Sequence, residues 1–148
     1  MIGLEFEIEN KFDNYLYKIL KNISTDNYVW KIIDDDAFCE KNMGFLFEKD
    51  EYNNDEFFEL IKNIKSYIIF CTILLYKENV KSLKIETPED FINSDCELIL
   101  LITDNIFVEI YCKSEELEKQ IRHNLFEMNI DFKEKNIFCR KKMNGRYD

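Results

Sequence analysis

The strongest constraint on the fold is a pair of apolar segments, residues 97–103 and 106–112, that are separated by only two residues. The linking residues are Asp104 and Asn105, and residues of this kind tolerate the positive φ angles that a tight β-hairpin requires. Residues 98–102 are continuously apolar, which is typical of a strand that is covered on both faces. The sequence therefore predicts a hairpin within a sheet that is covered on both sides.

Other segments also have the periodicity of strands. Residues 2–8 alternate between apolar side chains and Gly or Glu, which predicts a half-buried strand. Residues 67–76 are almost wholly apolar, which predicts a central strand covered on both faces. Shorter strands are expected at 28–33, where the acidic run 34–36 should end the strand, and at 44–47, 130–132 and 137–139, with a loop at 48–54.

Helices are indicated by apolar residues spaced three and four apart. Such a stripe predicts an amphipathic helix over residues 12–23. Asn53 and Glu56 form a capping-box pattern that predicts the start of a second helix. Thr87 before Pro88 predicts a short third helix that ends near residue 94, and Ser114 predicts the start of a long last one.

The chain has 148 residues, which is the usual size of one domain. Its 13 Phe, 8 Tyr and 1 Trp supply large side chains for a core and argue against simple disorder. We expect a single α+β domain over residues 1–148, in which a mixed, largely antiparallel sheet packs against two or three helices. Residues 141–148 are polar and are expected to form a frayed tail.

The net charge is −10, from 30 acidic against 20 basic residues. This charge repels nucleic-acid phosphates and anionic membrane surfaces, and it attracts a basic protein partner. The longest apolar stretch has about ten residues, half of the roughly 20 that a membrane-spanning helix needs. The sequence therefore favours a basic protein as partner over nucleic acid or membrane. The predicted contact residues are Asp34, Asp35, Asp36, Asp50, Glu51 and Asp55.

Five cysteines are spread along the chain, and none of them forms a CxxC pair. An ordinary zinc site is therefore not expected. The odd number of cysteines and the lack of a signal peptide predict reduced thiols in the cytoplasm. Because each cysteine has apolar or aromatic neighbours, we interpret all five as small buried hydrophobic residues.

Catalytic patterns are weak in this sequence. His123 is the only histidine, and its helical position places it about 200° from Ile121, toward solvent. No phosphate-binding glycine loop and no hydrolase or kinase motif occurs. The acidic run at 34–36 lacks the glycine and the later acid of a calcium loop. No catalytic residue, cofactor or metal is therefore predicted.

Three hypotheses on function remain open at this stage. The first is a non-enzymatic interaction module, such as an inhibitor or immunity protein, that binds a basic partner. The second is a small-molecule-binding or enzymatic domain with a cleft near the 97–112 hairpin. That cleft would be lined by Cys96, Glu109, Tyr111 and His123. The third is a structural protein that dimerises through a sheet edge.

Two blocks of the sequence carry a resemblance to a known family. They are Met1-Ile2-Gly3-Leu4-Glu5-Phe6-Glu7-Ile8-Glu9-Asn10, and Ser94-Asp95-Cys96-Glu97 running into Ile110-Tyr111-Cys112-Lys113. Together with the strand that contains Trp30, they resemble a family of small bacterial proteins known only as a domain of unknown function. The resemblance covers nearly the whole chain, and Gly145-Arg146 is similar to the family's C-terminal end. It implies no activity and no functional residue.

Overall fold

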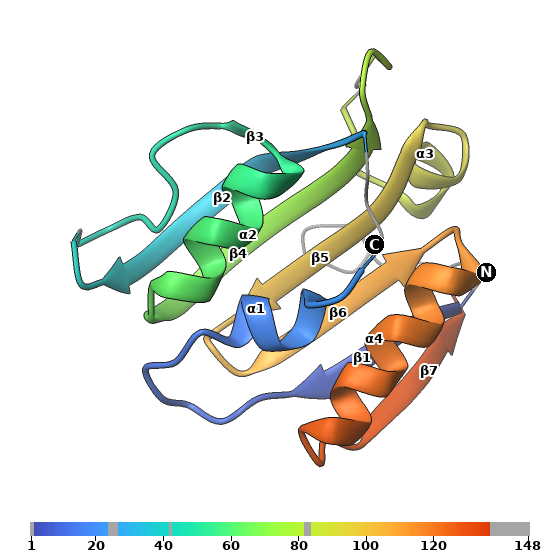
Figure 1. Cartoon of the computed structure of the whole chain (residues 1–148). Helices are drawn as coiled ribbons and strands as arrows, with labels where there is room; N and C mark the ends of the chain where they lie inside the picture. Colours follow the sequence, from blue (N-terminus) through green and yellow to red (C-terminus); the bar gives the residue numbers. More distant parts are fainter. Residues whose placement is uncertain (1, 24–26, 42, 82–83, 137–148) are drawn as a thin grey trace.

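The fold is built on one seven-stranded sheet (Figure 1). A computed structural model describes residues 2–23, 27–41, 43–81 and 84–136. The spatial order of the strands is β3-β2-β4-β5-β6-β1-β7, and all six pairings between neighbouring strands of the described chain are antiparallel. The strands are β1 (Ile2–Glu7), β2 (Tyr28–Cys39), β3 (Glu51–Asn53), β4 (Ser66–Lys77), β5 (Cys96–Thr103), β6 (Phe107–Cys112) and β7 (Phe132–Asn136).

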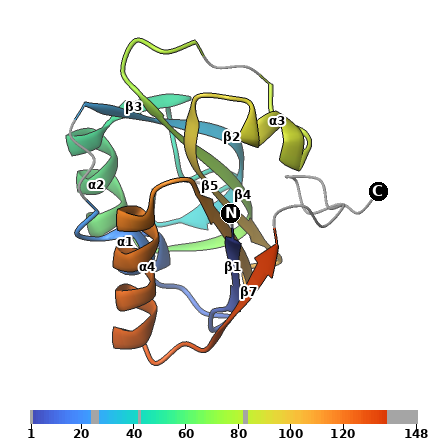
Figure 2. The same ribbon diagram turned by 90° about the vertical axis from the view of Figure 1, so that its right-hand side faces the viewer.

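Helices cover the two faces of the sheet unequally. Figure 2 views the sheet near its edge and shows α1 (Tyr15–Leu20), α2 (Asn54–Asn63) and α4 (Glu115–Glu127) on one face. The short α3 (Pro88–Ile92) lies on the other side. We call these the helix face and the open face. The α+β class and the antiparallel character are thus confirmed, and the sheet is antiparallel throughout the described chain rather than mixed.

Each face of the sheet has its own apolar cluster. The larger cluster lies under α1, α2 and α4, and it includes the Trp30 ring, which is stacked on Phe57 at a centroid distance of 4.2 Å. The smaller cluster lies on the open face and includes Phe91 of α3 with Ile99 and Leu101 of β5. Strand β5 therefore contributes to both clusters, as its continuous apolar run predicts.

The predicted hairpin between β5 and β6 is confirmed. Asp104 and Asn105 have φ angles of 54° and 59°, the left-handed pair that a two-residue hairpin turn requires. Asn105 is only 2% exposed, and its side chain accepts a hydrogen bond from the Ile68 amide at 2.8 Å. The same side chain donates to Asn10 at 2.9 Å. The turn residue therefore ties the hairpin to β4 and to the chain that follows β1.

The predicted helix starts are also confirmed. Asn53 and Glu56 form a reciprocal capping box, and Thr87 forms another with Asp90 ahead of α3. Ser114 accepts a hydrogen bond from the Leu117 amide at the start of α4. None of the helices in the described part of the chain is long and apolar enough to cross a membrane.

Several predicted boundaries were wrong. Strand β2 continues through residues 34–36 to Cys39, with a bulge on either side of this run. Asp34 and Asp36 are exposed there, and Asp35 is half-buried. No strand forms at 44–47, and β3 lies instead within the loop expected at 48–54.

The outer helix and terminal strand boundaries also differ. Helix α1 covers only Tyr15–Leu20, because Asp13 pairs with Ser66 of β4 before it and Asn22 takes a φ of 64° after it. Strand β7 begins at Phe132, whereas a strand was expected at 130–132. The strand predicted at 137–139 and the tail at 141–148 lie outside the described residues.

Candidate functional site

A row of five side chains crosses the open face of the sheet near one end. The register pairs Asp36 with Phe70, Phe70 with Thr103, Thr103 with Phe107, and Phe107 with Glu7. Residues directly opposite one another in antiparallel strands project from the same face. The row therefore presents two phenylalanines around a threonine, with a carboxylate at each end.

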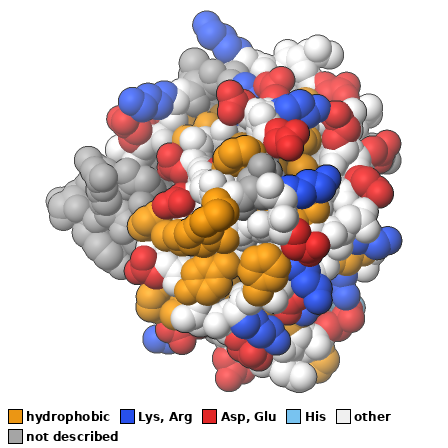
Figure 3. Space-filling view, turned by 90° about the vertical axis from the view of Figure 1, so that its left-hand side faces the viewer, with side chains coloured by type: hydrophobic (Ala, Val, Ile, Leu, Met, Phe, Trp, Pro, Cys, Tyr) orange, Lys and Arg blue, Asp and Glu red, His pale blue; other side chains and the backbone are white. Residues whose placement is uncertain are grey.

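A second row adds to this apolar surface. Phe38 is paired with Tyr67 and also forms a bridge with Met43. Phe38, Met43, Phe70 and Phe107 are 42%, 84%, 45% and 48% exposed. We call these four residues with Tyr67 the aromatic patch. Figure 3, viewed from the end where β2 ends and the β5–β6 hairpin turns, shows hydrophobic side chains gathered on the surface with acidic side chains nearby.

The structure separates the six acidic residues predicted to bind a partner. Asp34 and Asp36 are exposed, and Asp36 directly adjoins the aromatic patch. The Asp35 carboxylate is instead half-buried and accepts hydrogen bonds from two backbone amides of the 46–47 segment, at 2.6 to 3.0 Å. Burial raises the pKa of Asp35, and the two amides oppose that change. Asp35 thus anchors a loop.

The other three predicted acids lie away from this row. Asp50 and Glu51 are at the outer edge of the sheet, where Glu51 forms an ion pair of 3.2 Å with Lys31. Asp55 is in the first turn of α2 and is exposed. Glu51 also projects from the open face, opposite Lys31, but of the predicted set only Asp34 and Asp36 lie there beside the aromatic side chains.

Of the four residues of the alternative cleft, three lie on the open face and His123 does not. Glu109 and Tyr111 lie side by side on the open face, and the Tyr111 hydroxyl donates to Glu109 Oε2 at 2.6 Å. Cys96 is in the apolar cluster of that face, where burial raises the pKa of its thiol to about 12. His123 is on α4, across the sheet, with its Nε2 2.7 Å from Glu127. His123 and the Cys96 thiol therefore form no nucleophile–base pair.

A groove opens where β1 and β7 diverge, and it has a volume of about 950 Å³. Its apolar lining includes the buried side chains of Phe6 and Ile8. One wall comes from α1 and the segment before it, and the opposite wall comes from residues 127–133. Phe107 and Glu7 line the groove as well, so it is continuous with the row that carries the aromatic patch. No cluster of three or more metal-ligating side chains was found among the described residues.

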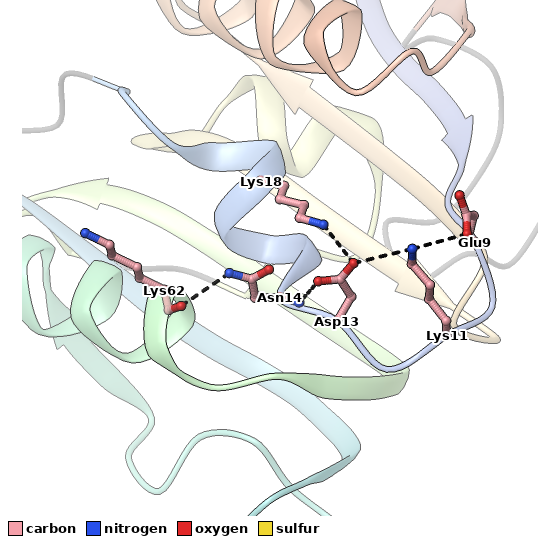
Figure 4. A network of polar contacts seen from close by, with 6 residues as sticks. All are labelled: Glu9, Lys11, Asp13, Asn14, Lys18 and Lys62. Atoms are coloured by element: carbon pink, nitrogen blue, oxygen red, sulfur yellow. Dashed lines mark hydrogen bonds and ion pairs between the residues drawn. The ribbon is translucent and has the colours of Figure 1, made fainter.

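A polar network lies on the α1 side of this groove (Figure 4). The Asp13 carboxylate accepts a hydrogen bond from Lys18 at 2.7 Å and one from the Asn14 amide at 2.8 Å. Lys11 lies 3.8 Å from the same carboxylate and 3.3 Å from Glu9. The Asp13 side chain is only 12% exposed, whereas the Lys18 side chain is 41% exposed, so this ion pair is partly buried.

We expect Asp13→Asn to lower the free energy of unfolding by about 2 kcal/mol at neutral pH. Burial alone would raise the pKa of Asp13, but Lys18 and the Asn14 amide outweigh it and hold the pKa below its usual value of 3.8. The stabilisation is therefore complete above the unfolded-state pKa and is lost as the pH falls through the folded-state value. Urea unfolding at several pH values measures this effect.

The control for this substitution is Glu9→Gln, because Glu9 also pairs with Lys11 but its side chain is 76% exposed. Its removal should change stability little at any pH. A difference between wild type and Asp13→Asn that stays constant down to the lowest pH would contradict the assigned role of the carboxylate.

Comparison with known proteins identifies the class of protein that this fold represents. The family described as "Protein of unknown function (DUF2691)" matches residues 1–143, so the chain belongs to that family. The chain is similar to the uncharacterised protein YncE of Bacillus subtilis (strain 168), with 29% identity over 135 residues and 87% of each chain covered. No solved structure matches. The predicted bacterial family of unknown function is thus confirmed, while the use of Ser94–Glu97 as its signature stays a prediction.

Proposed function

We propose that this protein is a non-enzymatic interaction module of the inhibitor or immunity type, which binds a basic protein partner in the cytoplasm. The observation that carries the proposal is the row across the open face, in which Phe70 and Phe107 are exposed between Asp36 and Glu7. The aromatic patch supplies the contact area, and the acidic ends of the row supply the preference for a basic partner.

Exposed aromatic side chains of this kind are typical of interaction surfaces. Removing apolar surface from water contributes about 25 cal/mol per Å², and aromatic side chains frequently dominate the binding energy of an interface. Four residues of the aromatic patch are each 42% exposed or more, so an occupant would remove substantial apolar area from water. These properties support a docking surface better than a merely solvated sheet face.

The charge around the aromatic patch favours a basic partner over a second copy of the chain. Asp34, Asp36 and Glu7 are exposed beside the apolar residues. Two copies facing each other through this surface would bring like charges together, and each chain carries a net charge of −10. A basic partner instead gains attraction at long range and faster association at low salt.

The test measures how tightly variants of the full chain bind the protein that co-purifies with the wild-type chain from its source cells. The double variant Phe38→Ser with Phe70→Ser should weaken the complex by about 30-fold or more, because each ring is expected to fill a central contact. Phe126→Ser is the matched control, since Phe126 is 78% exposed but lies on α4. Isothermal titration of the purified partner with each variant measures the two dissociation constants.

A second pair of substitutions tests the charge. Asp34→Asn with Asp36→Asn should weaken the complex mainly at low salt and reduce the salt dependence of its dissociation constant. The proposal would be contradicted if the partner bound three proteins with equal affinity: the wild type, the Phe126→Ser variant, and the patch variant, which carries Phe38→Ser with Phe70→Ser. A dimer of this chain that dissociates in the patch variant would make a second copy the occupant and would also contradict it.

A further inference from the structure

The row across the open face carries its charge only at its two ends. Asp36 on β2 and Glu7 on β1 are exposed carboxylates, and the three residues between them are uncharged. A second carboxylate lies two residues before each of these acids, and therefore on the same face; these are Asp34 and Glu5. Glu5 is paired with Lys135 at 3.3 Å, so Glu7 is the main acid of its end. A segment lying along the row would meet negative charge, then aromatic surface, then negative charge again.

The spacing of the strands sets the distances along the row. Neighbouring strands lie about 4.8 Å apart, so Phe70 and Phe107, which are two strands apart, are separated by about 10 Å. Asp36 and Glu7 are four strand spacings apart, or about 19 Å. Thr103 lies midway between the two rings and has a much shorter side chain than either phenylalanine. It therefore leaves room between the rings for a side chain of the occupant.

An occupant of this face must satisfy its own main-chain hydrogen bonds. The N–H and C=O groups of the strands under the row are directed at neighbouring strands within the sheet, so the face offers none to an occupant. An extended segment laid on the face would press its own amides and carbonyls against aromatic rings without partners, and each buried group would cost free energy. An α-helix pairs these groups internally. A helix is therefore the segment that this face accepts.

The rise of an α-helix fits the distances along the row. At about 1.5 Å per residue, two turns advance by about 10.5 Å and four turns by about 21 Å. A helix of four turns across the strands can therefore place a basic side chain near each acidic end, with an apolar side chain above Thr103 at its middle. A helix along the strands is less favourable, because α3 and its apolar cluster occupy the open face near the other end of the strands (Figure 1).

We propose that the row binds an amphipathic α-helix, laid across the strands, with Lys or Arg at both ends of an apolar stripe. The inference rests on the proposed function, because it assigns this helix to the basic partner that covers the aromatic patch. It adds the secondary structure and the direction of the segment that is recognised. Phe38 then lies along one side of the helix, and Asp34 and Glu5 lie along the other.

The test titrates the ¹⁵N-labelled full chain with the helix-forming peptide acetyl-KAQALAQLAQALAQK-amide, in which lysines flank a stripe of leucines. We expect chemical-shift changes at the Phe70, Thr103 and Phe107 amides and a dissociation constant of about 1 mM or below. Two control peptides should each bind at least about tenfold more weakly. In one, proline replaces the alanine that follows the middle leucine and blocks the helix. In the other, glutamate replaces both lysines and reverses the charge.

Variants of the protein complete this test. Phe70→Ser with Phe107→Ser should weaken the parent peptide at least about tenfold, because both rings contact the apolar stripe. Asp36→Asn with Glu7→Gln should weaken it mainly at low salt. Phe126→Ser on α4 is the matched control and should bind the peptide like the wild type. The ¹⁵N spectrum of each variant shows that the fold is kept.

Two results would overturn the helix inference. One is binding of the proline peptide as tightly as the parent, and the other is the absence of shift changes along the row. If the natural partner still required Phe38 and Phe70 in either case, the proposed function would stand without the helix.

Discussion

Replacing Asn124 with alanine is expected to lower the free energy of unfolding by about 4 kcal/mol. Asn124 is completely buried in α4, and its side-chain amide donates to the carbonyls of Ile19 and Lys21, both at 2.8 Å. These carbonyls are in and just beyond the last turn of α1, where helical partners are missing. Alanine leaves both acceptors without this donor, and each buried group that loses its partner costs about 1–3 kcal/mol.

The matched control for this prediction is Gln120→Ala. Gln120 donates to the Asn124 carbonyl oxygen at 3.0 Å from the more accessible side of α4, so its loss leaves the α1 carbonyls paired. We expect a change below about 1 kcal/mol for this control in urea unfolding. A similar small change for Asn124→Ala would show that the amide does not hold α1 against α4.

The second large effect is expected at the β5–β6 turn, where Asn105→Ala should destabilise the fold by about 3 kcal/mol. About 1 kcal/mol comes from the φ of 59°, which alanine adopts less readily than asparagine. The remainder comes from the buried Ile68 amide, which loses its acceptor.

Asn105→Gly separates these two causes. Glycine adopts a positive φ without strain but makes no side-chain hydrogen bond, so it should recover about 1 kcal/mol relative to alanine. Thermal or urea unfolding of the two variants gives this difference. Equal stabilities would contradict the assigned contribution of the backbone, and a glycine variant as stable as wild type would contradict the contribution of the Ile68 bond.

The parts of the fold that could be predicted from sequence are those that depend on neighbouring residues. The caps at Asn53, Thr87 and Ser114 and the turn at Asp104–Asn105 each require side chains within a few positions of one another. The continuation of β2 through residues 34–36 could not be predicted in this way. It depends on bulges and on Asp35 contacts with amides about eleven residues away.

The aromatic patch could not be predicted for a related reason. Phe38, Phe70 and Phe107 are separated by more than 30 positions, and only the register of β2, β4, β5 and β6 brings them to one face. Asp34, Asp35 and Asp36 are adjacent in the sequence, and all three were therefore predicted to contact the partner. Alternation along a strand places Asp35 on the opposite face from its two neighbours.

Asn124 was also missed, although the sequence contains a signal for it. It follows Ile121 by three positions and therefore lies on the apolar stripe of α4, where a polar residue requires buried partners. The identity of those partners, the Ile19 and Lys21 carbonyls, depends on how α1 packs against α4. No local pattern contains that information.

The central claim is that the aromatic patch on the open face contacts a basic partner. Its most direct test is photo-cross-linking from a benzoyl-phenylalanine placed at position 70 of the full chain inside the source cells, with position 126 as the matched exposed site. We predict one dominant cross-linked protein of basic isoelectric point from position 70, and none of that protein from position 126. The same products from both positions, or no product from position 70, would contradict the claim.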